Sequence, residues 1–143
     1  MPETTARRSR RGPAAAGTVD ALHDDLEGLW ALACRVPETD RMAFALAVVE
    51  AATNVVLHAV PAAEAPVELE VELTADSHRL EARIHEIGAA PVTVDLDGGM
   101  SDPDEETGRG MALIQALVSR VLVEREGDTN VWRLSRDCGR ETP

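Results

Sequence analysis

Three polar side chains, Glu50, Asn54 and His58, recur every four residues within an otherwise apolar stretch of the chain. Residues four apart share one face of an α-helix, so a helix here would present a carboxylate, an amide and an imidazole together. On a buried helix, an unpaired polar group costs roughly 1–3 kcal/mol, so we expect a hydrogen-bond network, water or a bound ion. The alternative is that Glu50 and Asn54 point to solvent and that His58 simply precedes the break at Val60-Pro61.

A second group of residues suited to chemistry begins at Thr107, where the chain continues as Gly108-Arg109-Gly110-Met111 into an apolar run. Backbone N–H groups and the positive dipole end at a helix start can hold an anion, and glycine allows close approach of a phosphate. The same glycines could instead form a plain hinge. A base, a metal ligand and anion-binding amides would suffice for phosphoryl transfer, because that reaction depends on positioning and charge neutralisation.

The spacing of apolar residues predicts the elements that would position these groups. Three- and four-residue spacing indicates helices, whereas alternation of apolar and polar residues indicates strands. The predicted order is helix (18–35), helix (39–59), strand (67–73), strand (80–85), long loop (92–110), helix (111–118), strand (121–124) and strand (130–134). We therefore predict an α+β fold with the helices on one face of a largely antiparallel sheet.

Residues 1–17 are rich in Arg, Ala, Gly and Pro and have no core-forming pattern. We predict a flexible N-terminal segment over 1–17, a domain over 18–137 and a C-terminal tail over 138–143. Four arginines in the first eleven positions could form a nucleic-acid arm or a solvated, disordered end. No clear strand precedes residue 18, so the sheet either lacks an edge strand or forms one from residues 14–19.

The composition limits the classes of partner. The 143 residues fit one domain, and the formal net charge of -12 would repel nucleic acid and anionic membranes. An acidic body of this kind suits a basic protein partner or a metal-bridged ligand. Aromatic residues make up only 2% of the chain, which argues against stacking on nucleic-acid bases.

Cysteine usage and hydropathy bear on the compartment. Cys34 and Cys138 lie far apart and show no metal-ligand spacing, which favours reduced thiols in a cytoplasm. No run of eighteen apolar residues occurs, and no apolar stretch follows the charged N-terminus. We therefore expect a cytoplasmic protein that is neither secreted nor membrane-spanning.

Four motifs occur in an order that resembles a known family. They are Glu50-x3-Asn54 on an early helix, Glu86-Ile87-Gly88 ending a strand, Gly108-Arg109-Gly110-Met111 after a long loop, and Gly127-Asp128-Thr129 in the last hairpin. Over residues 18–137 the chain resembles the bacterial anti-sigma-factor serine/threonine kinases of the GHKL ATPase superfamily, which includes histidine-kinase catalytic domains, gyrase B and Hsp90. The resemblance implies the histidine-kinase-like ATPase fold, a two-layer sandwich on a mostly antiparallel mixed sheet.

The resemblance also implies roles for individual residues. Glu50 would be the general base, Asn54 would bind the Mg²⁺ that bridges the phosphates of ATP, and His58 would assist placement of the phosphate or the nucleophile. The remaining nucleotide-binding residues fall in the adenine motif, the phosphate-binding motif and the last hairpin. They are Glu86, Gly88, Gly108, Arg109, Gly110, Met111 and Thr129.

The adenine motif departs from the family pattern Asp-x-Gly-x-Gly. Glu86 replaces the aspartate, and Ala90 replaces the second glycine. The additional methylene of Glu86 moves the carboxylate by roughly 1.5 Å, which would misplace a hydrogen bond unless the backbone compensates. Acidic residues of the long loop between the adenine motif and Gly108 would also crowd a triphosphate unless they lie on a solvated lid. They are Asp95, Asp97, Asp102, Asp104, Glu105 and Glu106.

The leading interpretation is an anti-sigma regulator that phosphorylates a serine or threonine of an anti-anti-sigma (STAS-type) protein with ATP and Mg²⁺, and that holds a sigma factor when free. The resemblance also implies a homodimer, without direct contact to nucleic acid or membrane. The alternative is a non-catalytic interaction module on the same fold, with weakened or lost ATP binding. A third hypothesis is an unrelated α+β domain in which every motif is a turn or a core residue.

Overall fold

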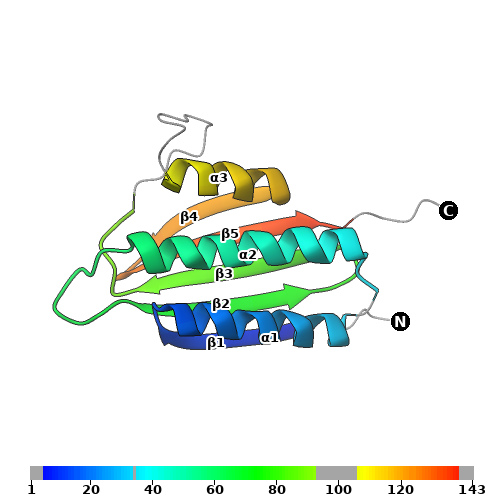
Figure 1. Ribbon diagram of the computed structural model, residues 1–143, viewed down its shortest axis with the longest axis horizontal. Helices are drawn as coiled ribbons and strands as arrows, with labels where there is room; N and C mark the ends of the chain where they lie inside the picture. The colour runs from blue at the N-terminus through cyan, green and yellow to red at the C-terminus, as the bar shows by residue number, and fades with distance from the viewer. Residues whose placement is uncertain (1–4, 34, 93–105, 139–143) are drawn as a thin grey trace.

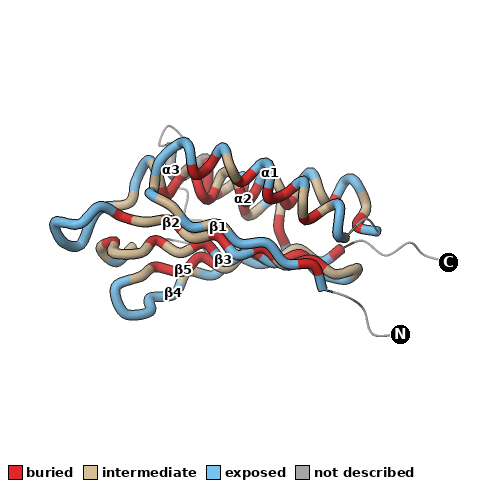
Figure 2. The backbone as a smooth tube through the Cα atoms, turned by 90° about the horizontal axis from the view of Figure 1, so that it is seen from below, coloured by how far each residue is buried: buried red, intermediate tan, exposed pale blue. Residues whose placement is uncertain are grey.

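The computed structural model describes residues 5–33, 35–92 and 106–138, with the side chains of 106–109 excepted. Their elements form two layers, one of helices and one of strands (Figure 1). Figure 2 shows the two layers from the side. In chain order they are β1 (Ala6–Pro13), α1 (Ala16–Leu32), α2 (Glu38–His58), β2 (Glu68–Ala75), β3 (Arg79–Ile87), α3 (Glu106–Leu117), β4 (Arg120–Glu126) and β5 (Thr129–Asp137).

The five strands form one sheet in the order β1-β2-β3-β5-β4. Every pairing between these strands is antiparallel, so the described sheet contains no parallel pair. The three helices lie on the same face of the sheet (Figure 1). The predicted α+β sandwich and both predicted hairpins are therefore confirmed. The second hairpin turns at Gly127, whose φ of 62° is a conformation that glycine adopts without steric cost.

The core lies between the layers and consists mainly of aliphatic side chains. Helix α2 occupies the middle of the helix layer and buries small residues together with Phe44. The alternation of β2 and β3 directs every second residue toward the helices, among them Leu69, Val71 and Ile84. By length and composition α2 would qualify as a membrane span, but this apolar character belongs to a core helix packed between α1, α3 and the sheet.

The N-terminal prediction was wrong for residues 6–13, which form the edge strand β1 rather than a flexible segment. They do so because basic β1 lies beside acidic β2, with Arg11 opposite Glu70 in register and its guanidinium 3.3 Å from Glu68. On the other face, Arg10 forms a 2.8 Å ion pair with Asp25 of α1. The sheet therefore has an edge strand, and residues 14–19 do not form it, since the strand ends at Pro13 and α1 begins at Ala16.

Two other boundaries differ from prediction. Helix α3 begins at Glu106 rather than at 111, so residues 106–110 are helical and the glycines lie within the first turns. Each glycine costs about 1 kcal/mol of helix propensity, which packing against α2 must offset. Cys138 continues the fold beyond 137, because its backbone N–H donates to the carbonyl of His78. The loop residues 93–105 and the tail residues 139–143 lie outside the described residues.

Candidate functional site

The first and third sequence motifs meet where α2 lies against the start of α3. A Cβ atom at Gly110 would lie 2.9 Å from Oε1 of Glu50, and 3.1 and 3.2 Å from Nδ2 and Oδ1 of Asn54. The shortest of these separations is one that real Cβ atoms essentially never show, so any other residue at this position would require the end of the Glu50 side chain to move. We call Glu50, Asn54 and Gly110 the α2–α3 cluster.

The polar groups of the α2–α3 cluster lack partners within the described part of the chain. Asn54 is 7% exposed, and Glu50 is half-buried. Among residues 5–33, 35–92 and 106–138, neither the Asn54 amide nor the Glu50 carboxylate makes a hydrogen bond or ion pair. The polar atoms of these two side chains are also not among the fully buried atoms of the described residues that lack a partner, so they retain contact with solvent and are available to a ligand.

The donor set of the α2–α3 cluster fits Mg²⁺ held together with phosphates. Amide and carboxylate oxygens are ligands that Mg²⁺ accepts, and the ion usually takes only one or two from protein, the others coming from phosphates and water. The described residues contain no group of three or more His, Cys, Asp or Glu side chains that could hold a metal alone. Asn54 is therefore suited to a nucleotide-bound ion rather than to an independent metal site.

His58 lies apart from the α2–α3 cluster. It is exposed in the last turn of α2 and makes an interaction of its own. Each step of four residues advances the direction of a side chain by about 40°, so His58 points about 80° away from Glu50 around the helix axis. The three side chains therefore do not point in one direction. Of the three, Glu50 and Asn54 face Gly110.

A second polar cluster lies on the helix-facing side of β3 and β5. Glu86 is 2% exposed, and its Oε2 accepts a 3.0 Å hydrogen bond from Nε1 of Trp132. The side chain of Asn130 also donates to Glu86, and Arg125 contributes a favourable charge. Burial nevertheless prevails and raises the pKa of Glu86 above its ordinary value, against the effects of Trp132, Asn130 and Arg125 in that order. We call Glu86 of β3, Asn130 and Trp132 of β5, and the adjoining Arg125 of β4 the β3–β5 cluster.

The β3–β5 cluster also fixes the backbone that follows β3. Nη1 of Arg125 donates to the carbonyl of Ala89 at 2.6 Å and to Oδ1 of Asn130 at 3.0 Å. Nδ2 of Asn130 donates to the carbonyl of Ala90 at 2.8 Å. On the other side, the N–H of Ala90 donates to the carbonyl of Val60 at 2.7 Å. The altered end of the adenine motif is therefore held between the last hairpin and the loop after α2.

Trp132, Asn130 and Arg125 were not among the residues selected from sequence, although strand periodicity carried a signal for two of them. Alternation places residues 130, 132 and 134 on one face of β5 and Thr129 on the other. A buried tryptophan usually finds an acceptor for its N–H, so a carboxylate partner for Trp132 was foreseeable. Thr129, which was selected, is half-buried and its hydroxyl donates to the side chain of Asp128 at 2.9 Å.

The other selected residues occupy varied places. Met111 is a buried core residue, 7% exposed. Gly88 has a φ of 77°, which suits glycine at the turn after β3. Gly108 lies in the first turn of α3, whereas the side chain of Arg109 is outside the described part. The last turns of α2, the start of α3, the end of β3 and the β4–β5 turn all lie at one end of the molecule (Figure 1).

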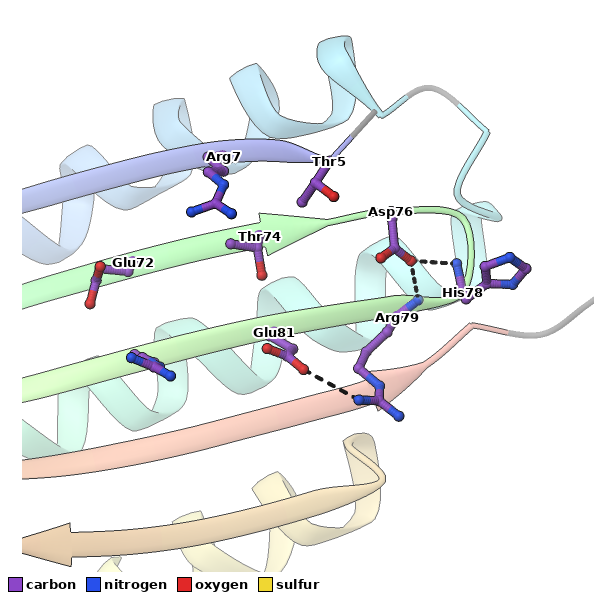
Figure 3. A pocket seen from close by; sticks show the side chains of 9 residues that line it. Thr5, Arg7, Glu72, Thr74, Asp76, His78, Arg79 and Glu81 are labelled. Carbon is purple, nitrogen blue, oxygen red and sulfur yellow. Dashed lines mark hydrogen bonds and ion pairs between the residues drawn. The ribbon is translucent and has the colours of Figure 1, made fainter. Parts of the chain in front are cut away.

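A cavity of about 540 Å³ lies on the opposite, helix-free face of the sheet (Figure 3). Asp76, Arg79 and Glu81 of its lining form interactions within it. The Asp76 carboxylate accepts hydrogen bonds from the backbone N–H groups of His78 and Arg79, and the Arg79 side chain lies 3.5 Å from Glu81. No selected residue lines this cavity. We assign the candidate site to the helix side, because two of the sequence motifs meet there at Glu50, Asn54 and Gly110.

A comparison with protein families gives a match over most of the chain. The family model of the histidine kinase-like ATPase domain matches residues 13–136, a span that contains both clusters. A comparison with curated proteins gives no significant match.

Proposed function

The chain belongs to the histidine kinase-like ATPase domain family, and from this premise we propose that it is an anti-sigma regulator with ATP-dependent protein serine/threonine kinase activity. Membership of this family implies ATP as the ligand, typically with Mg²⁺. The substrate in this proposal is a serine or threonine of an anti-anti-sigma protein of the STAS type. The same body would sequester a sigma factor when free, as a homodimer in the cytoplasm.

The observation that carries the proposal is the state of the α2–α3 cluster. Asn54 is largely buried as a residue, but its amide atoms are not fully buried and make no hydrogen bond in the described part of the chain, and it faces the backbone of Gly110 at the start of α3. A helix start offers free N–H groups and positive dipole charge to phosphates. A partnerless amide beside such an anion site is what binding of a metal–phosphate group would require.

In this proposal, Asn54 and Glu50 have different roles in phosphoryl transfer. Asn54 would hold Mg²⁺, which when bound neutralises charge on the phosphates. Glu50 would accept the proton of the substrate hydroxyl as that oxygen attacks phosphorus. The Gly110 backbone approaches both side chains closely, so a nucleotide at the helix start would lie beside the base. This arrangement supplies positioning and electrostatic stabilisation, on which phosphoryl transfer mainly depends.

A second candidate function is a non-catalytic interaction module with weakened ATP binding. The β3–β5 cluster favours it, because Glu86 already accepts hydrogen bonds from Trp132 and Asn130. In addition, the backbone at Ala89 and Ala90 is held by Arg125 and Asn130. A carboxylate that already accepts hydrogen bonds within the protein has fewer lone pairs left for a nucleotide base. The partnerless Glu50 and Asn54 favour the kinase.

Calorimetric titration with ATP and Mg²⁺ tests the proposal. We expect binding by the parent protein and a loss of at least tenfold in Asn54→Ala, a fold-change that corresponds to about 1.4 kcal/mol. The control is Thr53→Ala on the same helix, since the Thr53 hydroxyl donates to the carbonyl of Val49 rather than to the cluster. No measurable heat from the parent at millimolar ATP would contradict nucleotide binding.

Transfer to a partner is tested separately from binding. The parent, incubated with labelled ATP and candidate STAS-type proteins, should phosphorylate one of them, and Glu50→Gln should abolish the transfer while retaining ATP binding. Phosphorylation that survives in Glu50→Gln removes this residue from the role of base. Binding of ATP without transfer to any partner would favour the interaction module.

A further inference from the structure

We propose that Trp132 is a positioning residue that aims the Glu86 carboxylate at the base of the bound nucleotide, so that discrimination between purines depends on one indole N–H group. This inference rests on the proposed nucleotide-binding function and deepens it. It concerns a contact between two side chains of this chain, Trp132 and Glu86, that lie 46 positions apart.

The register of the sheet makes this contact possible. Glu86 is directly opposite Asn130 on β5, and Ile84 is opposite Trp132. Trp132 is therefore the diagonal neighbour of Glu86 on the same face, at a distance that a large aromatic side chain spans. The indole N–H reaches Oε2 of Glu86 at 3.0 Å, and Asn130 donates to the same carboxylate. Two donors from one strand thus hold the end of a flexible side chain.

Holding this carboxylate matters because glutamate is longer and more mobile than aspartate. Fixing a glutamate side chain costs up to about 1.5–2 kcal/mol of conformational entropy, which reduces affinity if the ligand itself must impose the order. In this structure the protein imposes it beforehand. Trp132 and Glu86 are only 5% and 2% exposed, so their packing restricts other rotamers.

The hydrogen-bond capacity of the pair leaves room for a ligand. A carboxylate has about four lone-pair sites, and two donors from β5 use two of them. The indole is a donor without an acceptor, so it favours the carboxylate as an acceptor and opposes the rise in the pKa of Glu86 that burial causes. A further donor from the ligand can therefore bind the same group.

The chemistry of this acceptor selects among purines. An exocyclic amine on the base donates to a carboxylate, whereas a carbonyl oxygen at the same position is repelled by it. ATP and ITP differ at this position, with an amine in ATP and a carbonyl in ITP. The pair therefore favours ATP over ITP, and the preference depends on how firmly Trp132 holds Glu86.

The first test compares affinities for Mg·ATP and Mg·ITP by calorimetry. Trp132→Phe keeps the ring and removes the donor, and we expect it to weaken ATP binding by about tenfold while changing ITP binding little, as loss of a charge-assisted hydrogen bond implies. The control is Trp30→Phe on α1, whose ring stacks edge-to-face on Phe44 with a centroid separation of 6.2 Å. A general loss of structure would weaken both nucleotides equally, and an unchanged ATP/ITP ratio in folded Trp132→Phe overturns the inference.

A second measurement leaves Trp132 in place and so does not depend on the folding of that variant. The chain has two tryptophans, so Trp30→Phe labelled with ¹⁵N contains a single indole N–H, that of Trp132. We expect its resonance to shift on addition of Mg·ATP and to move less with Mg·tripolyphosphate. A resonance that responds equally to both overturns the inference and leaves nucleotide binding intact. Failure of ATP, ITP and tripolyphosphate all to bind overturns the proposed function as well.

Discussion

Asn54 of the α2–α3 cluster and Asn130 of the β3–β5 cluster are both buried asparagines, 7% and 2% exposed, but their amides differ in hydrogen bonding. Asn130 accepts from Arg125 and donates to the carbonyl of Ala90 and to Glu86. Asn54 has no partner within the described part of the chain. Since buried amides normally have partners, Asn130 has the environment of a structural residue and Asn54 that of a ligand-binding residue.

The carboxylates of the two clusters differ in the same way. Glu86 is held by Trp132 and Asn130, whereas Glu50 is half-buried and makes no hydrogen bond or ion pair to the described residues. A group that forms its bonds during folding contributes to stability, and one that forms them with a ligand contributes to binding. Substitutions in the α2–α3 cluster should therefore act mainly on binding. Those in the β3–β5 cluster should act on stability, with Trp132 and Glu86 contributing to nucleotide binding as well.

The largest effect should come from replacing each asparagine by leucine. Asn130→Leu leaves Arg125, Glu86 and the Ala90 carbonyl each short of a partner, so we expect the free energy of unfolding to fall by about 3 kcal/mol. Asn54→Leu removes a group without such partners and should change stability by less than about 1 kcal/mol while reducing Mg·ATP binding. Urea denaturation measures the first quantity and calorimetry the second.

The outcome that breaks this contrast is simple to recognise. If Asn54→Leu destabilises the protein as much as Asn130→Leu, then Asn54 is part of the structural network. The argument that it serves a ligand would then be lost.

The next effect concerns the close approach of α3 to α2. Gly110→Ala places a Cβ 2.9 Å from Oε1 of Glu50, whereas Gly17→Ala in α1 places one in open space. Both replacements remove a helical glycine near a helix start, so their difference in free energy of unfolding reports mainly the steric conflict. We expect Gly110→Ala to be less stable than Gly17→Ala by about 1 kcal/mol, the low end for overpacked sites, because the end of the Glu50 side chain can move aside and the Asn54 amide must shift only by a few tenths of an ångström.

Thermal or urea denaturation of the two glycine variants provides this comparison, and ATP titration of Gly110→Ala extends it. Because Glu50 and Asn54 must move to admit the methyl group, nucleotide affinity should fall as well. Equal stability of the two variants would show that the α2–α3 contact is looser than the structure indicates.

Most of the fold was predictable because most elements bury one face. Periodicity identified α1, α2 and the strands β2 to β5, whose inward residues such as Leu69 and Ile84 are fully buried. Strand β1 was missed because its pairing depends on charge. Arg10 bonds to Asp25 and Arg11 to Glu68, so only Ala6 of this strand is a buried apolar residue. Alternation of apolar and polar residues therefore does not reveal an edge strand such as β1.

In the candidate site, too, the sequence predicts contacts that depend on local spacing but not those that depend on strand pairing. Glu50 and Asn54 are one helical turn apart, so their shared direction follows from sequence spacing alone. The partners of Glu86 do not, because β3 pairs with β5 and the chain passes through α3 and β4 between them. Without that register, neither the diagonal contact of Trp132 nor the inward direction of Asn130 opposite Glu86 could be derived.

The smallest effect should be the pH dependence that Glu86 gives to stability, because hydrogen bonds and Arg125 partly offset its burial. Its pKa is raised in the folded protein from 4.5, so between that value and the raised one the native state binds more protons than the unfolded state. The free energy of unfolding therefore loses this contribution as the pH rises through the folded pKa, and retains it fully below the unfolded one. Glu86→Gln removes the titration, so its stability relative to the parent should increase with pH across this window and then remain constant. Urea denaturation of both proteins from pH 4 to pH 8 measures this difference. If the stability of Glu86→Gln relative to the parent instead decreased with pH, the β3–β5 cluster would favour the charged carboxylate more than burial opposes it.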